Sequence, residues 1–199
     1  MGKYALPKPF RALLLVLGFA GATGSQAAEV RPMVKVGFDF GGETLATVVF
    51  TNGSTKSIKS NEGLFIGGGA SIFNEARDIE TEVALTYKIA RISAINAELE
   101  WTRVPLDVLV FYRMPRFRAG GGLTYHMNPE VSGSGAARNV NLQFDNALGL
   151  LLQADWLIID RKTLTMALGL RYTNIEYKLQ GTSASPNSSG LGITYSVSF

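Results

Sequence analysis

The sequence predicts an all-β protein, an eight-stranded antiparallel up-and-down transmembrane β-barrel. Three observations support this fold class. Apolar and polar residues alternate with a period of two in eight segments, as in strands whose two faces meet different surroundings. Clusters of Gly, Asn, Pro and Ser separate these segments. No stretch beyond the N-terminal segment approaches the ~18 consecutive apolar residues of a membrane-spanning helix.

The N-terminal segment has the three parts of an export signal. Its basic region carries Lys3, Lys8 and Arg11. An apolar core follows at residues 12–22, and Ser25-Gln26-Ala27 places small residues at the cleavage positions. The core is shorter than the ~20 residues that cross a bilayer as a helix, although an uncleaved anchor is the alternative. We therefore expect a signal peptide at 1–27 and a barrel domain at 28–199.

Charge and composition exclude several functions. The chain has 19 Lys and Arg against 16 Asp and Glu, but three of the basic residues and none of the acidic ones precede Ala27. The expected mature chain therefore carries 16 of each, so its basic isoelectric point is no evidence for nucleic-acid binding, which needs a basic patch. With no Cys and a single His, we expect no disulfide, no transition-metal site and no cofactor.

The first two strands are expected at 33–51 and 54–73. Val34, Val36, Phe38 and Phe40 share one face of the first strand, and Gly41-Gly42 is a candidate bulge within it. Asn52-Gly53 is a strong signal for a two-residue hairpin, because a type I′ turn needs positive φ at both positions. The sequence therefore predicts a tight first hairpin.

The third and fourth strands are expected at 78–90 and 98–113. Residues 74–77 form the turn before the third strand, which alternates throughout, and a loop at 91–97 follows it. Pro105 lies inside the fourth strand and cannot donate a ladder hydrogen bond, so we expect a bulge there.

The fifth and sixth strands are expected at 116–127 and 143–158. Met114-Pro115 is a tight turn before the fifth strand, and a long loop rich in Gly and Ser, 128–142, follows it. The triplets Gly67–Gly69 and Gly120–Gly122 are not followed by the helix start of a phosphate-binding loop. We interpret both as relief of crowding or barrel curvature.

The last two strands are expected at 163–180 and 190–199. A short turn at 160–162 precedes the seventh strand, and a polar loop at 181–189 separates it from the eighth. The connections after the second, fourth and sixth strands are thus short, whereas the others are longer except for the first hairpin. This asymmetry is typical of barrels that cross an outer membrane.

Alternation alone does not say which face of each strand is outside. The polar face carries charges of both signs mixed with Gly and Thr, which suits a narrow polar lumen. Its expected lumenal charges are Lys35, Asp39, Glu80, Glu82, Lys88, Asp107, Arg116, Arg118, Asp155 and Arg171. We expect them to form a network of ion pairs and hydrogen bonds, because an unpaired buried charge is costly. A polar conduit for small solutes is the alternative.

Aromatic residues on the apolar face support a lipid-facing exterior. Tyr112, Tyr125, Trp156, Tyr172, Tyr195 and Phe199 are expected near strand ends, as in interfacial girdles. A soluble lipocalin-like barrel, with its apolar face inward, is the competing interpretation. Solubility in buffer without detergent would favour that alternative.

The closing segment Gly190–Phe199, GLGITYSVSF, alternates strictly and ends on an aromatic residue. It resembles the terminal assembly signal of bacterial outer-membrane barrels, and residues 30–199 resemble the small eight-stranded proteins of the OmpA/OmpX/OmpW type. The resemblance implies a Gram-negative outer membrane, contact with its lipid and lipopolysaccharide, and recognition of Phe199 by the barrel assembly machinery. The tight first hairpin departs from the resemblance, because a longer exposed loop is common there.

Catalysis is not expected. Some barrels of this class that trim lipid A use a Ser-His-acid arrangement, but no Ser stands two residues after His126. Ser132 and Ser134 lie in the expected loop, so His126 is interpreted as a polar residue at the barrel rim. We therefore expect a non-enzymatic protein.

The expected role is a structural one in the envelope or an interaction through loops 128–142 and 181–189. Passive transport of small polar or apolar solutes is the alternative. The segment Trp101–Asp107 could serve a sideways opening for apolar solutes, with Pro105 interrupting the wall. It could equally anchor a strand end, with Trp101 among the lipid headgroups and Arg103 directed at a lipid phosphate or at Asp107.

Overall fold

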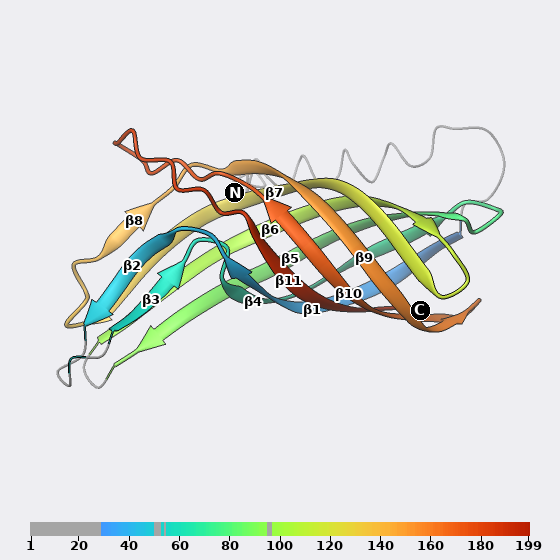
Figure 1. Cartoon of the computed structure of the whole chain (residues 1–199), viewed down its shortest axis with the longest axis horizontal. Helices are drawn as coiled ribbons and strands as arrows, with labels where there is room; N and C mark the ends of the chain where they lie inside the picture. Colours follow the sequence, from blue (N-terminus) through green and yellow to red (C-terminus); the bar gives the residue numbers. More distant parts are fainter. Residues whose placement is uncertain (1–28, 50–52, 54, 95–96) are drawn as a thin grey trace, which may run out of the picture.

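The computed structural model describes residues 29–49, 53, 55–94 and 97–199, so the expected signal peptide lies outside the described residues. Eleven strands make up this part of the chain (Figure 1). They are β1 Glu29–Gly41, β2 Thr44–Val49, β3 Thr55–Lys59, β4 Gly63–Phe73, β5 Ile79–Ser93, β6 Ala97–Arg113, β7 Phe117–Gly135, β8 Asn141–Gln143, β9 Ala147–Arg161, β10 Leu164–Asn174 and β11 Gly190–Ser198. The described residues contain no helix of the length and apolarity that a membrane crossing requires.

Eight of these strands form a closed antiparallel barrel. Going round the wall, the order is β1, β4, β5, β6, β7, β9, β10 and β11, so consecutive barrel strands are neighbours. The pairing of β1 with β11, from Met33↔Ser198 to Gly41↔Gly190, joins the first strand to the last. The expected eight-stranded up-and-down barrel is therefore confirmed, and closure leaves its wall without a free edge.

The first connection differs from the prediction. β1 ends at Gly41, because Gly41 and Gly42 adopt φ values of 104° and 82°, which other residues rarely adopt. β2 and β3 then pair as a separate two-stranded sheet, with Val49↔Thr55 next to the turn. The predicted tight hairpin between the first two barrel strands is therefore wrong. The Asn52-Gly53 signal lies instead in the connection between β2 and β3, although Asn52 itself is outside the described residues.

The fifth barrel strand is longer than predicted. β7 continues to Gly135 and pairs with β8, so most of the expected loop at 128–142 is strand. Asn128 has a φ of 48°, and β7 there has one more residue than β6 between Thr102↔Glu130 and Val104↔Met127. This is a β-bulge, which lets a strand change direction without ending.

Pro105 lies beside this bulge. On its other side, the pairing of β6 with β5 runs to Leu85↔Leu106 and resumes at Lys88↔Arg103. The interruption in the ladder at Pro105 was expected, but the extra residue belongs to β7. Elsewhere, β10 ends at Asn174 instead of residue 180.

The two ends of the barrel are different. One end, called here the turn end, has the short connections Asn74–Asp78, Met114–Arg116 and Lys162–Thr163. The other end, the loop end, carries the β2–β3 hairpin, β8 and residues 175–189, and Figure 1 shows β2, β3 and β8 gathered at this one end of the barrel. Phe199 follows β11 at the turn end, where its N–H donates to the Pro32 carbonyl at 3.0 Å.

The distribution of polarity across the wall is inverted relative to a soluble barrel. Large apolar side chains from every barrel strand are exposed on the outside, among them Val34, Leu64, Tyr87, Val110, Leu123, Leu152, Leu170 and Ile193. Charged side chains are buried inside. The expected orientation of the two faces is therefore confirmed, and this exterior is suited to lipid instead of water.

Candidate functional site: the lumen

A network of ion pairs fills the lumen at the turn end. Five cationic and five carboxylate side chains are connected through pairs of 4.0 Å or less. They are Arg31, Lys35, Arg77, Arg113 and Arg118 with Glu29, Glu80, Glu82, Asp155 and Asp160. Five of the eight barrel strands and the turn between β4 and β5 supply these residues, so the network links opposite sides of the wall. The charges within it balance.

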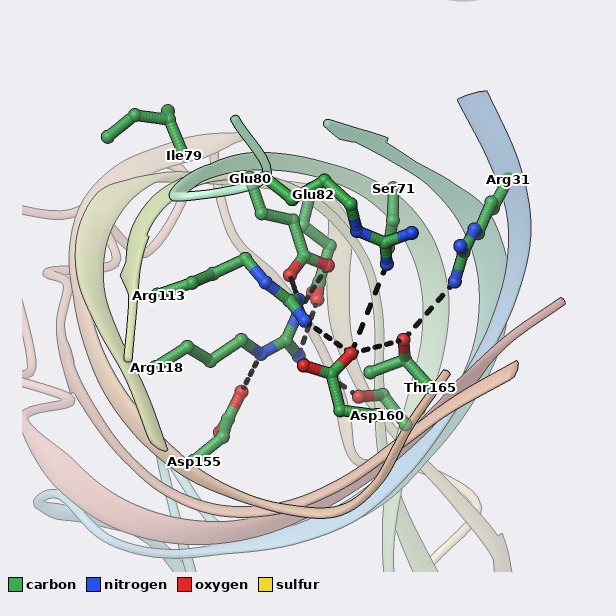
Figure 2. Close-up of polar contacts among 12 residues, drawn as sticks. Arg31, Ser71, Ile79, Glu80, Glu82, Arg113, Arg118, Asp155, Asp160 and Thr165 are labelled. Atoms are coloured by element: carbon green, nitrogen blue, oxygen red, sulfur yellow. Dashed lines mark hydrogen bonds and ion pairs between the residues drawn. The ribbon is translucent and has the colours of Figure 1, made fainter. Parts of the chain in front are cut away.

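Arg118 is the centre of this network. Its guanidinium lies between Glu80 and Glu82 on one side and Asp155 on the other, as Figure 2 shows. The distances are 2.5 Å to Glu80, 3.1 Å to Glu82 and 2.7 Å from Nε to Asp155, and Nη2 also donates to the Ser196 hydroxyl. All three nitrogens of the planar guanidinium therefore donate, which is the arrangement that offsets burial of its charge.

Three arginines of this end also pack on one aromatic ring. The guanidinium carbons of Arg31, Arg77 and Arg113 lie 4.8 to 5.0 Å from the centroid of Phe73. Phe73 ends β4 and is fully buried, so its ring faces are available inside the mouth of the barrel. Stacked cations and their carboxylates thus occupy the turn end of the lumen.

A second group of charges lies nearer the loop end. Lys88 contacts Asp39 and donates to the Asn61 side chain at 3.2 Å. Arg171 approaches Asp39 at 3.6 Å and Asp107 at 3.2 Å. Asp107 also accepts a hydrogen bond from Thr124, so β1, β5, β6, β7 and β10 are joined across the lumen.

An apolar core closes the lumen above this group. Its buried members come from β3, from wall strands β5, β6, β7 and β9, and from the segments after β8 and β10. They are Ile58, Ala90, Ile92, Leu99, Trp101, Val131, Phe144, Ala147, Ile175 and Tyr177. Trp101 is fully buried, with its ring centroid 5.2 Å from Phe144 and 5.3 Å from Tyr177. Its Nε1 donates to the Ser60 carbonyl at 3.0 Å. The predicted position of Trp101 among lipid headgroups is therefore wrong.

Arg103 and His126 lie just beneath this apolar core. Arg103 is fully buried, stacks on Trp101 at 4.8 Å and donates from Nη2 to the Glu62 carbonyl at 2.7 Å. His126 Nδ1 lies 2.5 Å from the Tyr177 hydroxyl. Arg103 is thus directed into the lumen and not at lipid, and His126 lies inside the barrel and not at its rim.

Nine of the ten predicted lumenal charges are buried inside the barrel. Lys35, Glu80, Glu82, Arg118 and Asp155 belong to the turn-end network, and Asp39, Lys88, Asp107 and Arg171 belong to the second group. The tenth, Arg116, is exposed, because the fifth barrel strand begins one residue later, at Phe117, and Arg116 lies in the turn.

The prediction also missed part of the network. Arg31 and Arg113 are buried lumenal cations, and Glu29, Arg77 and Asp160 complete the ring at the mouth. Arg113 continues the inward alternation of Asp107, Leu109 and Phe111, so the period-two pattern could have identified it. Arg77 lies in a turn, where no alternation indicates direction.

The residues considered for catalysis are not brought together. Ser132 lies in β7 six residues beyond His126, and at ~3.3 Å per residue the two are separated by roughly 20 Å. The imidazole instead contacts Tyr177. In the described part of the chain, no three His, Asp or Glu side chains are grouped as metal ligands.

A closed barrel with an apolar outer wall and an ion-paired lumen defines a transmembrane β-barrel. No protein-family model and no curated protein matches the sequence. Among solved structures, Neisserial surface protein A is 12% identical, and the match covers 87% of this chain and 100% of that one with a TM-score of 0.51. Ail, the attachment invasion locus protein of Yersinia pestis, is 6% identical over 87% and 99% of the two chains, with a TM-score of 0.53. The chain therefore has the fold of the small eight-stranded outer-membrane barrels, as its sequence resemblance predicted.

Proposed function

We propose that this protein is a closed, non-conducting and non-enzymatic barrel of a Gram-negative outer membrane. Its role is to stabilise the envelope or to present its folded loop end to partners outside the cell. The observation that carries the proposal is the filled lumen. The interior is occupied by large side chains both at the turn end and toward the loop end. Among them, Trp101, Arg103, Arg118 and Tyr177 are all less than 2% exposed.

The alternative, passive transport of a small polar or apolar solute, requires these contacts to open. An ion moving along the axis would have to separate the turn-end ion pairs and then cross the apolar core around Trp101. Both steps are unfavourable, because one leaves buried charges unpaired and the other strips water from the ion.

Planar-bilayer recording tests the closed lumen. The purified barrel, refolded and inserted into a planar membrane, is expected to give no single-channel steps in symmetric potassium chloride. A pore-forming barrel added to the same membrane checks that insertion and recording work. Reproducible unitary steps that scale with the amount of folded protein would contradict the proposal and favour transport.

The proposal also includes the roles of Phe199 and the assembly machinery. The Phe199 side chain is 55% exposed on the lipid-facing exterior beside the β1–β11 pair. We expect Phe199→Ala to lower the amount of folded barrel in cells several-fold, because the terminal aromatic is what the assembly machinery would bind. Phe199→Tyr should preserve assembly, and deletion of Ser183 in the exposed loop should have little effect.

Heat-modifiable mobility in a denaturing gel measures the folded fraction in each strain. The same variants folded into pure lipid vesicles separate a recognition signal from a stability effect. A loss seen equally in cells and in vesicles would contradict the role of Phe199 as a recognition signal.

A further inference from the structure

The charges of the loop-end group do not balance. Lys88, Arg103 and Arg171 face two carboxylates, Asp39 and Asp107. Lys88 and Arg171 pair with these carboxylates, whereas Arg103 forms no ion pair within the residues that the structure describes. The turn-end network, in contrast, has equal numbers of cations and carboxylates. Arg103 is thus the cation of this group that has no carboxylate in direct contact, although Asp39 and Glu62 act on it from a longer distance.

Arg103 also has donors without acceptors. Its Nη2 donates to the Glu62 carbonyl, but Nε and Nη1 are buried and have no hydrogen-bond partner. The Glu62 carboxylate accepts from the Lys59 N–H and forms no ion pair with Arg103, on which its charge acts from a longer distance. Burial of a guanidinium with two nitrogens whose N–H groups are unused is unfavourable unless an acceptor lies beside them.

The neighbouring His126 contributes a third unused donor. Its Nδ1 lies beside the Tyr177 hydroxyl, and when that hydroxyl donates to Nδ1 the imidazole proton lies on Nε2. His126 Nε2 is buried and has no partner in the described structure.

These donors lie on adjacent strands and face the same space. His126 on β7 pairs directly with Pro105 on β6, and Arg103 is two residues along β6 on the same inward face. Both side chains also approach Tyr177, His126 through Nδ1 and Arg103 through its guanidinium. Pro105 has no N–H to compete, and the buried Thr173 hydroxyl from β10 is also unpartnered.

We propose that a small monovalent inorganic anion of the halide class binds in the lumen between Arg103 and His126. The anion supplies the missing negative charge and accepts the unused N–H groups. The anion thereby completes the polar lumen at the boundary with the apolar core. Water is the competing occupant, because it would accept from these N–H groups and could donate to Asp39 Oδ1, the unpartnered carboxylate oxygen of the same group.

Trp101 provides a probe of this site, because Arg103 stacks on its ring at 4.8 Å. The chain has two tryptophans, so Trp156→Phe leaves Trp101 as the only one. In this variant, folded in detergent, iodide replacing gluconate at constant ionic strength is expected to quench Trp101 emission saturably. The fluorescence lifetime of the remaining emission should not change, as for a quencher that is bound.

Adding Arg103→Met to Trp156→Phe is expected to abolish the saturable component. Arg116→Met is the matched control, because Arg116 is exposed in a turn, and it should leave the quenching unchanged. Quenching that is absent, linear in iodide, or equal in the Arg103→Met variant would overturn the proposal and assign the space to water.

Crystals soaked in bromide provide a test that does not depend on folding of the Arg103→Met variant. An anomalous peak within hydrogen-bond distance of Arg103 and His126 in the otherwise native protein supports the proposal. Ordered density there without anomalous signal would identify a water molecule and overturn it.

Discussion

Replacing Arg118 by Met is expected to lower the free energy of unfolding by about 3–5 kcal/mol, since it leaves buried Asp155 without its ion-pair partner and takes one of two cations from Glu80 and Glu82. Arg118 is buried and contacts Glu80, Glu82 and Asp155 at once. Methionine retains much of the side-chain volume, so the loss should reflect charge more than packing. Urea unfolding of the barrel in lipid vesicles measures the change.

A control and a partial rescue separate this effect from a general loss of arginine. Arg116→Met, two residues earlier in an exposed turn, should leave stability unchanged within error. Asp155→Asn added to Arg118→Met should restore part of the loss, because among the described residues Asp155 pairs with no cation other than Arg118. If Arg118→Met and Arg116→Met had the same effect, the turn-end network would not stabilise the barrel.

Substituting Leu152 by Arg is expected to lower the free energy of unfolding by about 2–4 kcal/mol, the cost of a cation facing the middle of a bilayer. Leu152 is 60% exposed on the outside of β9 and lies near the middle of that strand. The same substitution at Ile158, which is 53% exposed but close to the turn end, should cost only about 0–1 kcal/mol.

The comparison between these two variants also tests the soluble alternative. Both side chains are more than half exposed, so a barrel surrounded by water would accept arginine at either position without loss. Unfolding in vesicles of matched lipid gives both values under the same conditions. Equal stability of the two arginine variants would therefore argue against a lipid-facing wall.

The architecture was largely predictable because the barrel strands obey one simple rule. Alternation with a period of two fixes which side chains point inward once closure is assumed, and Lys35, Glu82, Lys88 and Arg171 all follow it. The absence of a long apolar run and the asymmetry of the connections supported the same fold. These are local properties that a sequence shows directly.

The errors arose where local signals do not determine which elements pair. Asn52-Gly53 indicates a hairpin but does not say whether its strands belong to the wall or, as in β2–β3, to a separate sheet. The continuation of β7 through Asn128 depends on a bulge opposite Thr102 and Val104 of the preceding strand β6, and alternation in the sequence does not show this pairing. Arg116 was misplaced for a related reason, since one residue at a strand boundary decides between lumen and solvent.

The position of Trp101 could not be inferred from alternation alone. The pattern places it on the inward face, but an aromatic near a strand end is equally typical of an interfacial anchor. The loop-end segments that fold over the lumen determine the position of Trp101, because Phe144 and Tyr177 pack against its ring. These contacts join parts of the chain separated by more than forty residues.

The shared apolar core of the loop end limits how this protein could be redesigned as a display scaffold. Ile58, Ile92, Val131 and Ile175 come from four different connections or their flanking strands, yet all pack into one core. Exchanging a whole outer loop for a foreign epitope would therefore disturb the other three. The practical insertion point is the exposed tip at residues 181–183, where Gly181 has a φ of 76° and an added side chain would meet no atom within 4 Å.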